Sequence, residues 1–275
     1  MSDLQTLKPK DYKAESKPVW CPGCGHYAVL SALTKALAYL ELKREEVALV
    51  SGIGCSSRLP AYLDTYGFHG VHGRALPVAS GLKAARPELT VLAAGGDGDG
   101  FSIGGNHFLH ACRRNMDLTY IVMDNRVYGM TKGQASPTTE PEWQYSKLTP
   151  HGTGIPRFRP AAIALASGAG FIARGYSGKP ADLSRLLVKA IEYPGFAFVH
   201  VLSPCTTFRP EHREWKSQVH PCEREALDDP IDASRCMQTD DGFTLGILYR
   251  QPHAIWRPPH HAEGSMMRIE KEFRR

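Results

Sequence analysis

The sequence lacks long hydrophobic runs and a strong excess of either charge, and each lack excludes a class of protein. None of its apolar stretches approaches the roughly 18 residues of a membrane-spanning helix. Residues 1–17 are polar and contain no apolar segment of the kind found in signal peptides. The net charge of +5 is too small to indicate nucleic-acid binding, although it would favour an acidic protein partner. We therefore expect a soluble, cytoplasmic protein with neither a membrane nor a nucleic acid as partner.

Internal repeats are also lacking, and the composition excludes a largely disordered chain. Apolar residues make up 42% and charged residues 22% of the 275 positions, which is ordinary for a protein with a buried core. The seven cysteines are an odd number, and a reducing compartment argues against disulfides. Thiols in such a compartment more often serve metal binding or redox chemistry, so their spacing is informative.

Helical and strand-like segments alternate along the chain. Leucines at 30, 33, 37 and 40 predict an amphipathic helix over 26–40, and a similar stripe predicts another over 180–193. Short apolar runs predict strands at 47–50, 89–94, 118–123 and 196–202, with a helix through 108–112 and one later strand-like piece at 243–249. This order predicts an α/β fold, with a mostly parallel sheet and helices on both faces. We expect three parts: an N-terminal arm (1–19), an α/β domain (20–208) and a C-terminal extension (209–275).

A glycine-rich turn with aspartates follows the strand predicted at 89–94. Asp97 stands at the end of that strand, and Asn125 stands at the end of the strand over 118–123. Ligands of open α/β sheets bind beyond the carboxyl ends of the strands. Carboxylate and amide oxygens suit Mg²⁺, and glycines let backbone N–H groups approach a diphosphate. The pattern favours a magnesium-diphosphate site, with a plain turn capped by an aspartate as the alternative.

Other glycine motifs do not fit this turn. Phe101 stands where the third glycine of a dinucleotide-binding motif would fall, and the acidic residues of a calcium loop are missing. With Asp124-Asn125 about one βαβ unit later, the turn resembles the thiamine-diphosphate motif, in which GDG precedes an asparagine by such a distance.

Four of the cysteines occur in turns that a parallel sheet would bring together. Cys21 and Cys24 form a C-x-x-C, while Cys55 and Cys205 follow predicted strands. Four thiolates suit a zinc ion or a [4Fe–4S] cluster equally well by spacing. Thiamine-diphosphate chemistry on a 2-oxoacid leaves an electron-rich intermediate, for which a cluster is an electron acceptor and zinc is not. The other cysteines, at 112, 222 and 236, we interpret as structural.

Several motifs in fixed order resemble the β subunits of 2-oxoacid:ferredoxin oxidoreductases, between Trp20 and about Phe208. They are WCPGCGH (20–26), GIGCSSR (52–58), GFHGVHGR (67–74), GDGDGFSIGGNH (96–107) and MDNRVYGMTKGQASPT (123–138). The resemblance implies a [4Fe–4S] cluster on Cys21, Cys24, Cys55 and Cys205, and Mg²⁺ on Asp97, Asn125 and the carbonyl of Val127. It also implies that thiamine diphosphate is lined by Ile53, Gly54, Cys55, Ser56, His72, Gly98, Asp99, Gly129 and Met130.

The two-subunit enzymes that act on 2-oxoglutarate are the most similar branch. The resemblance implies oxidative decarboxylation of 2-oxoglutarate with coenzyme A to succinyl-CoA and CO₂, with electrons passing to ferredoxin, and the reverse carboxylation is an option. Arg58 could hold the far carboxylate of that substrate, because guanidinium binds carboxylate in bidentate fashion. Met130 and Lys132 are further substrate-binding candidates. No catalytic side chain is assigned, since the chemistry belongs to the cofactor.

Three alternatives remain open at this stage. The first is specificity for pyruvate or a broad range of 2-oxoacids. The second is a non-oxidative thiamine-diphosphate enzyme subunit with structural zinc, and the third is a non-catalytic, zinc-bearing scaffold subunit.

The length predicts that the active site is shared with another chain. Thiamine enzymes use a second α/β domain to hold the pyrimidine ring, as the family resemblance implies, and 275 residues leave no room for it here. We therefore expect an α subunit to supply that half and this chain to be inactive alone.

Overall fold

The computed structural model describes residues 7–144, 147–223 and 226–257. Within them, eight strands form one sheet in the order β2-β1-β3-β4-β6-β5-β8-β7. They span Val47–Ser51 (β1), Tyr66–His69 (β2), Thr90–Gly96 (β3), Leu118–Asp124 (β4), Phe171–Tyr176 (β5), Phe196–Leu202 (β6), His220–Pro221 (β7) and Thr244–Arg250 (β8). All neighbouring strands pair in parallel except β5 with β8. The predicted mostly parallel sheet is confirmed.

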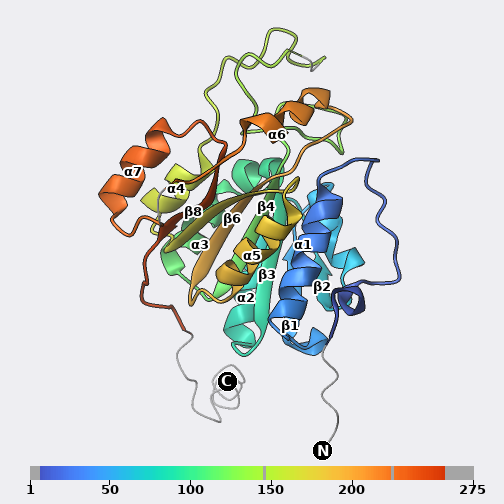
Figure 1. The fold of residues 1–275 in the computed structure, drawn as a ribbon, viewed down its shortest axis with the longest axis vertical. Coiled ribbons are helices and arrows are strands. Elements are labelled where there is room, and N and C mark those ends of the chain that lie inside the picture. Colours follow the sequence, from blue (N-terminus) through green and yellow to red (C-terminus); the bar gives the residue numbers. More distant parts are fainter. Residues whose placement is uncertain (1–6, 145–146, 224–225, 258–275) are drawn as a thin grey trace, which may run out of the picture.

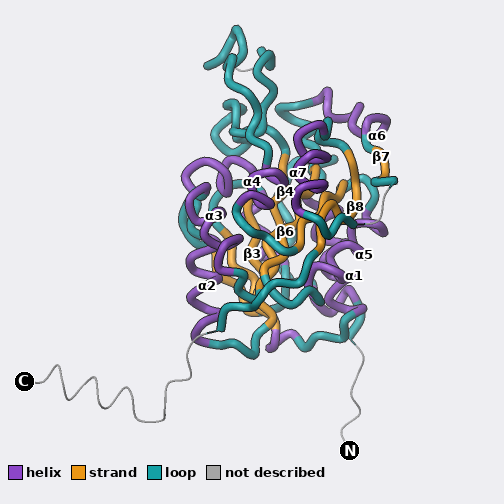
Figure 2. The backbone as a smooth tube through the Cα atoms, turned by 90° about the vertical axis from the view of Figure 1, so that its left-hand side faces the viewer, coloured by secondary structure: helices purple, strands orange, loops and turns teal. Residues whose placement is uncertain are grey.

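Helices cover both faces of this sheet (Figures 1 and 2). They are α1 (His26–Tyr39), α2 (Ala75–Ala85), α3 (Gly105–Arg114), α4 (Pro160–Ala166), α5 (Pro180–Ile191), α6 (Trp215–Gln218) and α7 (Pro230–Thr239). The core on one face is built with α1 and α5, and the core on the other with α2, α3, α4 and α7. Short 3-10 or π-helical turns connect them: η1 (Pro9–Tyr12), η2 (Arg44–Glu46), η3 (Ser56–Tyr62), η4 (Asp99–Ile103) and η5 (Pro210–Glu214).

The buried side chains explain why these segments fold as they do. Leu30, Leu33 and Leu37 of α1 recur at helical spacing and all lie in the core. Every residue of β4 and of β6 is buried, as expected for central strands with helices on both sides. Pro180 opens α5, where its fixed φ and missing N–H cost nothing.

The segments at the two ends of the chain pack on this core. In the predicted N-terminal arm, Tyr12 is fully buried and donates a hydrogen bond to the carbonyl of Leu37, at 3.2 Å. In the predicted C-terminal extension, β8 pairs with β5, and Ala233, Met237 and Tyr249 join the core. The parts of these two segments at 1–6, 224–225 and 258–275 lie outside the described residues. Among the described residues, no helix combines the length and hydrophobicity that crossing a membrane requires.

The carboxyl ends of the parallel strands gather at one edge of the sheet. The long connection between β4 and α4 rises above this edge, beside the segment that contains α6 (Figure 1). The turns after β1, β3, β4 and β6 meet here, and they carry Cys55, Asp97, Asn125 and Cys205 respectively.

Candidate functional site

A cavity of about 570 Å³ opens at this edge of the sheet. Its volume is typical of sites that hold a small molecule or cofactor. All the residues that we predicted to contact thiamine diphosphate or its magnesium line it: Ile53, Gly54, Cys55, Ser56, His72, Asp97, Gly98, Asp99, Asn125, Val127, Gly129 and Met130. The structure therefore brings the predicted residues together, while their binding roles stay predictions.

Asp97 is held in place by hydrogen bonds from the loop after β4. One of its carboxylate oxygens accepts from Ser136 Oγ and from Thr138 Oγ1, the latter at 2.8 Å, and the other accepts from the N–H of Asn125 at 3.4 Å. The side-chain oxygen of Asn125 in turn accepts from the N–H of Val127, at 3.2 Å. The predicted magnesium ligands are thus adjacent and ordered by the chain itself.

Two buried carboxylates, those of Asp97 and Asp124, lie close together at one end of the cavity, which we call the polar end. Thr138 Oγ1 is 2.8 Å from an oxygen of Asp97 and 2.8 Å from an oxygen of Asp124, so the two carboxylates share the single hydrogen of this hydroxyl. Burial raises the pKa of Asp97 to about 7, and repulsion from Asp124 adds to the rise. Burial also acts on Asp124, but the hydrogen bond from His200, together with the charge and the backbone N–H of Arg126, outweighs it and lowers the pKa of that carboxyl. A divalent cation fits this donor set because it would offset the repulsion.

Asp99 fastens three separate turns to one another. Its Oδ1 accepts hydrogen bonds from the N–H of Ile53 (3.0 Å), the N–H of Gly73 (2.7 Å) and Nδ1 of His72 (2.8 Å). Its Oδ2 is buried without a hydrogen-bond partner, and a β carbon at Gly52 would lie only 2.0 Å from it. The main task of Asp99 in the structure is to hold the turn after β1 and the His72 turn against the glycine–aspartate turn.

The four predicted cluster cysteines converge beside this cavity. Burial raises the pKa of Cys24 to about 12, and the neighbouring thiols of Cys205, Cys55 and Cys21 add to the rise. The pKa of Cys55 is raised by burial and then by Cys205 and Cys21, while Arg58 lowers it.

Backbone contacts join the three turns that carry these cysteines. The N–H of Gly25 donates to the carbonyl of Pro204 at 3.1 Å, and Thr206 Oγ1 donates to the carbonyl of Pro22 at 2.9 Å. Trp20 Nε1 donates to the carbonyl of Cys55 at 2.6 Å. Thiols are the ligands that an iron–sulfur cluster or a zinc ion takes, so the donor chemistry of these cysteines suits either group. Among the described residues, no three His, Cys, Asp or Glu side chains are arranged to hold one metal ion between them.

The predicted substrate residues lie in different positions. Met130 lines the cavity and is 47% exposed. Arg58 is exposed on η3, close enough to Cys55 to affect its thiol, and does not line the cavity. Lys132 is exposed in the same loop as Met130, with a left-handed φ of 79°. The structure brings only Met130 of these three to the cavity wall.

Several residues of the site were missed by sequence reasoning. His26 lines the cavity, and its Nε2 is buried without a partner while Nδ1 lies 2.7 Å from Ser203 Oγ. Burial lowers the pKa of His26 to about 4, so the ring is neutral. The Tyr128 hydroxyl donates to the carbonyl of Gly98 at 3.2 Å. The position of His26, directly after the C-x-x-C-G, was the one signal available.

A cluster of charges connects the loop after β4 with the loop after β6. Glu140 bonds both Arg126 and Arg209, the second at 2.6 Å. Arg209 also donates to the carbonyl of Arg126 at 2.9 Å and stacks over Trp143 at 4.4 Å. This cluster joins the loop of Asn125 to the loop of Cys205. It therefore connects the polar end of the site with the end that contains the cysteines.

Comparison with known proteins places this geometry in a family. Residues 52–201 match the family model described as thiamine pyrophosphate enzyme, C-terminal TPP binding domain. The chain is 39% identical over 254 residues to 2-oxoacid:ferredoxin oxidoreductase 2, subunit beta, of Aeropyrum pernix, covering 87% of this chain and 82% of that one. It is 45% identical over 204 residues to 2-oxoglutarate oxidoreductase subunit KorB of Mycobacterium tuberculosis, covering 74% of this chain and 54%, about half, of that one.

A solved structure extends the likeness over nearly the whole chain. The 2-oxoglutarate:ferredoxin oxidoreductase from Magnetococcus marinus, with 2-oxoglutarate, coenzyme A and succinyl-CoA bound, superimposes with a TM-score of 0.88 at 39% identity. The match covers 99% of this chain and 92% of that one. This chain therefore belongs to the thiamine pyrophosphate enzymes, within the β subunits of 2-oxoacid:ferredoxin oxidoreductases.

Proposed function

We propose that this chain is the β subunit of an enzyme of the 2-oxoglutarate synthase type. The reaction is the coenzyme A-dependent oxidative decarboxylation of 2-oxoglutarate to succinyl-CoA and CO₂, with two electrons delivered to ferredoxin. The observation that carries the proposal is that the cofactor-sized cavity directly adjoins the four cysteines Cys21, Cys24, Cys55 and Cys205. Cys55 belongs to both, and a β carbon at Gly129 of the cavity wall would lie 3.7 Å from its Sγ.

Thiamine diphosphate and Mg²⁺ would occupy the polar end of the cavity. Asp97, Asn125 and the carbonyl of Val127 would hold the cation, and the turn of Ile53 to Ser56 would contact the cofactor. The two neighbouring buried carboxylates of Asp97 and Asp124 support this fit, since a bound cation would offset their repulsion. His72 donates its Nδ1 proton to Asp99, which leaves Nε2 to face a ligand.

A [4Fe–4S] cluster would be bound by Cys21, Cys24, Cys55 and Cys205. When bound, thiamine diphosphate supplies the carbanion chemistry and the cluster supplies the electron acceptor. The protein contributes proximity, because one turn carries a cluster ligand and part of the cavity wall. Zinc on the same thiols is the alternative, and an iron assay of anaerobically purified protein distinguishes the two.

Arg58 would select a substrate with a second carboxylate. Its exposed guanidinium lies near Cys55, where a partner subunit could enclose it. Arg58→Ala should raise KM for 2-oxoglutarate about tenfold or more and change KM for pyruvate little, since a charge-assisted bond contributes ~1.5–3 kcal/mol. Equal effects on both substrates would contradict this role, and Lys132→Ala tests the weaker candidate in the same loop.

An α subunit would complete the active site. Exposed apolar side chains occur in and near the turns around the cavity, namely Ile53 (38% exposed), Phe68 (52%), Val71 (66%) and Met130 (47%). Apolar side chains gathered in this way are typical of a surface that a partner covers.

The deciding experiment uses this chain co-purified with its α subunit without oxygen. We expect reduction of ferredoxin that requires both 2-oxoglutarate and coenzyme A, and no turnover by this chain alone. Reduction that is equally fast with pyruvate would indicate broad specificity. Decarboxylation without electron transfer, together with zinc and no iron, would favour the non-oxidative alternative. Absence of thiamine diphosphate binding by the complex would favour the scaffold alternative.

A further inference from the structure

A series of hydrogen-bonded, buried polar side chains runs from the polar end of the cavity, at Asp97, to the C-terminal extension. Behind Asp97 and Thr138 lies Asp124, whose second oxygen is 2.7 Å from Nε2 of His200. Nδ1 of His200 is 3.2 Å from Nε of Arg174. The side chains of Asp124, His200 and Arg174 are all 5% exposed or less. Solvent therefore does little to weaken these interactions.

The bonds of His200 fix the position of its proton. Arg174 can only donate, so Nδ1 of His200 must accept and Nε2 must carry the hydrogen that Asp124 receives. Burial lowers the pKa of His200, in agreement with a neutral ring. Each group in this hydrogen-bonded series thus donates to the next, from Arg174 through His200 to Asp124.

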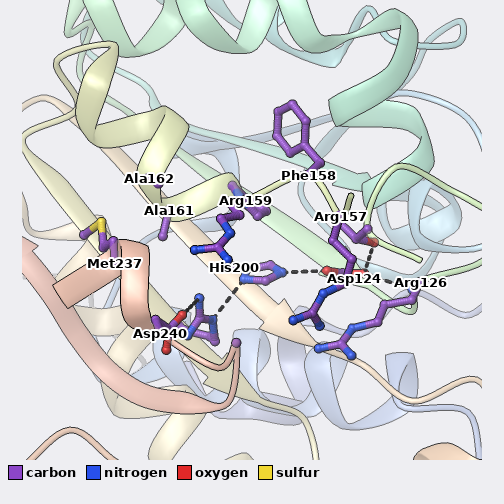
Figure 3. Close-up of a pocket in the computed structure, with 14 residues that line it drawn as sticks. Asp124, Arg126, Arg157, Phe158, Arg159, Ala161, Ala162, His200, Met237 and Asp240 are labelled. Atoms are coloured by element: carbon purple, nitrogen blue, oxygen red, sulfur yellow. Dashed lines mark hydrogen bonds and ion pairs between the residues drawn. The ribbon is translucent and has the colours of Figure 1, made fainter. Parts of the chain in front are cut away.

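The far end of this hydrogen-bonded series, Arg174, is anchored in the C-terminal extension. Arg174 Nη2 lies 2.7 Å from an oxygen of Asp240, and Nη1 donates to the carbonyl of Thr244 at 3.2 Å. A small cavity of about 40 Å³ lies beside the chain, and Asp124, His200 and Asp240 surround it (Figure 3). Each of the three nitrogens of the Arg174 guanidinium group therefore contacts the extension or His200, which fixes the orientation of Arg174.

We propose that His200 and Arg174 are positioning residues for the divalent cation, and that Asp240 and Thr244 of the C-terminal extension hold them in place. The proposal rests on the proposed function. Groups that orient a metal ligand from behind commonly change metal affinity ~10–100-fold when replaced, and His200 acts on the proposed ligand Asp97 through Asp124 and Thr138. Here Asp124 is oriented by His200, and Asp124 shares the hydroxyl of Thr138 with Asp97. The extension thereby acquires a role in cofactor binding although none of its described residues lines the cavity.

The test measures the dissociation constant of Mg²⁺ by calorimetry, with the α-subunit complex saturated with thiamine diphosphate. His200→Phe keeps the ring among Phe198 and Phe101 but removes both hydrogen bonds, and we expect binding about 10–100-fold weaker. His200→Gln restores both, since its amide can donate to Asp124 and accept from Arg174, and should bind within about threefold of wild type. Asp240→Asn weakens the ion pair that anchors Arg174, and its Mg²⁺ affinity should lie between those of His200→Phe and His200→Gln.

His220→Phe is the matched control, because His220 is a half-exposed histidine of the extension that contacts Asp241 outside this chain of side chains. It should leave the affinity unchanged. Unchanged Mg²⁺ affinity in His200→Phe would overturn the proposal. If His200→Phe does not fold, unchanged affinity in Asp240→Asn would overturn it equally. If the wild-type complex binds no Mg²⁺, the proposed function fails and this inference fails with it.

Discussion

The two ends of the cavity are held in different ways. At the polar end, Asp97 and Asp99 accept hydrogen bonds from several turns of the chain, so the carboxylates are ordered by the protein itself. At the cysteine end, backbone bonds bring the turns together, but burial and mutual repulsion raise the pKa of Cys24 and of Cys55. A bound cationic centre would reverse that effect, since coordination deprotonates a thiol.

Because they are held differently, the two ends should respond separately to the loss of their ligands. The polar end is organised before binding, so removing the cluster should leave it intact. The cysteine end would depend on the proposed cluster for the stability of four thiolates. Glu140 and its two arginines form one polar link between the two ends.

The largest expected effect comes from replacing a cysteine ligand. Cys24→Ser should abolish ferredoxin reduction by the complex, because the electron acceptor is lost, while thiamine diphosphate still binds within a few-fold of wild type. Iron content and calorimetric binding are the measurements. Cys222→Ser, at a partly exposed cysteine outside the group, should change neither. Loss of thiamine diphosphate binding in Cys24→Ser would show that the two ends are not independent.

Replacing the buried carboxylate of Asp97 should have the opposite pattern, in which cofactor binding is lost and the iron is kept. Asp97→Ala should weaken Mg²⁺-dependent thiamine diphosphate binding by more than the ~100-fold typical of supporting residues, because a proposed metal ligand is removed. The iron content should stay at the wild-type value. Asp182→Ala, at an exposed position of α5, is the control. Iron loss in Asp97→Ala would contradict the separation of the two ends.

Most of the sheet could be predicted because its strands are continuous apolar runs, as in β1, β3, β4 and β6. Strand β2 escaped prediction because all four of its residues are exposed at the sheet edge. Helix α2 contains Pro77 and Gly81, which obscure its helical pattern. Strand β5 contains Arg174, whose burial depends on an ion pair with Asp240, 66 residues later in the chain. Local patterns carry no information on such distant pairing.

The site could be predicted where strand ends supply it, and not where a long loop returns to it. Asp97 and Asn125 follow strands directly and Cys55 lies in the turn after β1, so the parallel sheet alone implies their proximity. Thr138 reaches Asp97 only through the path of the loop after β4, which no periodicity in the sequence describes. His26 begins a helix and belongs to the site because that helix starts beside the cysteine turn.

A smaller effect should come from crowding the polar end without changing its charge. Gly52→Ala would place a β carbon 2.0 Å from Asp99 Oδ2, so the turn after β1 must move away from the carboxylate. We expect the free energy of unfolding to fall by about 3 kcal/mol, at the upper range for overpacking, together with weaker thiamine diphosphate binding. Gly81→Ala is the matched control, because nothing lies within 4 Å of its β carbon and the position is helical. Its stability should be equal or up to ~1 kcal/mol higher. Equal stability of the two variants would mean that the polar end is less rigid than its hydrogen bonds indicate.

The smallest effect should come from the link between the two ends. Burial acts to raise the pKa of Glu140, but Arg126 and Arg209 outweigh it and lower the pKa to about 2. A carboxyl whose folded pKa is depressed stabilises the fold above its unfolded pKa of 4.5, and that contribution is lost as the pH falls toward 2. A pKa shift of this size corresponds to ~3 kcal/mol, and solvent at the 30% exposed side chain screens part of it. Glu140→Gln should therefore reduce the free energy of unfolding by about 2 kcal/mol at pH 7, and the difference from wild type should shrink between pH 4.5 and pH 2. Denaturant unfolding at several pH values measures this, with exposed Glu45→Gln as control. A difference that stays constant over that range would show that the Glu140 charge does not join the two ends.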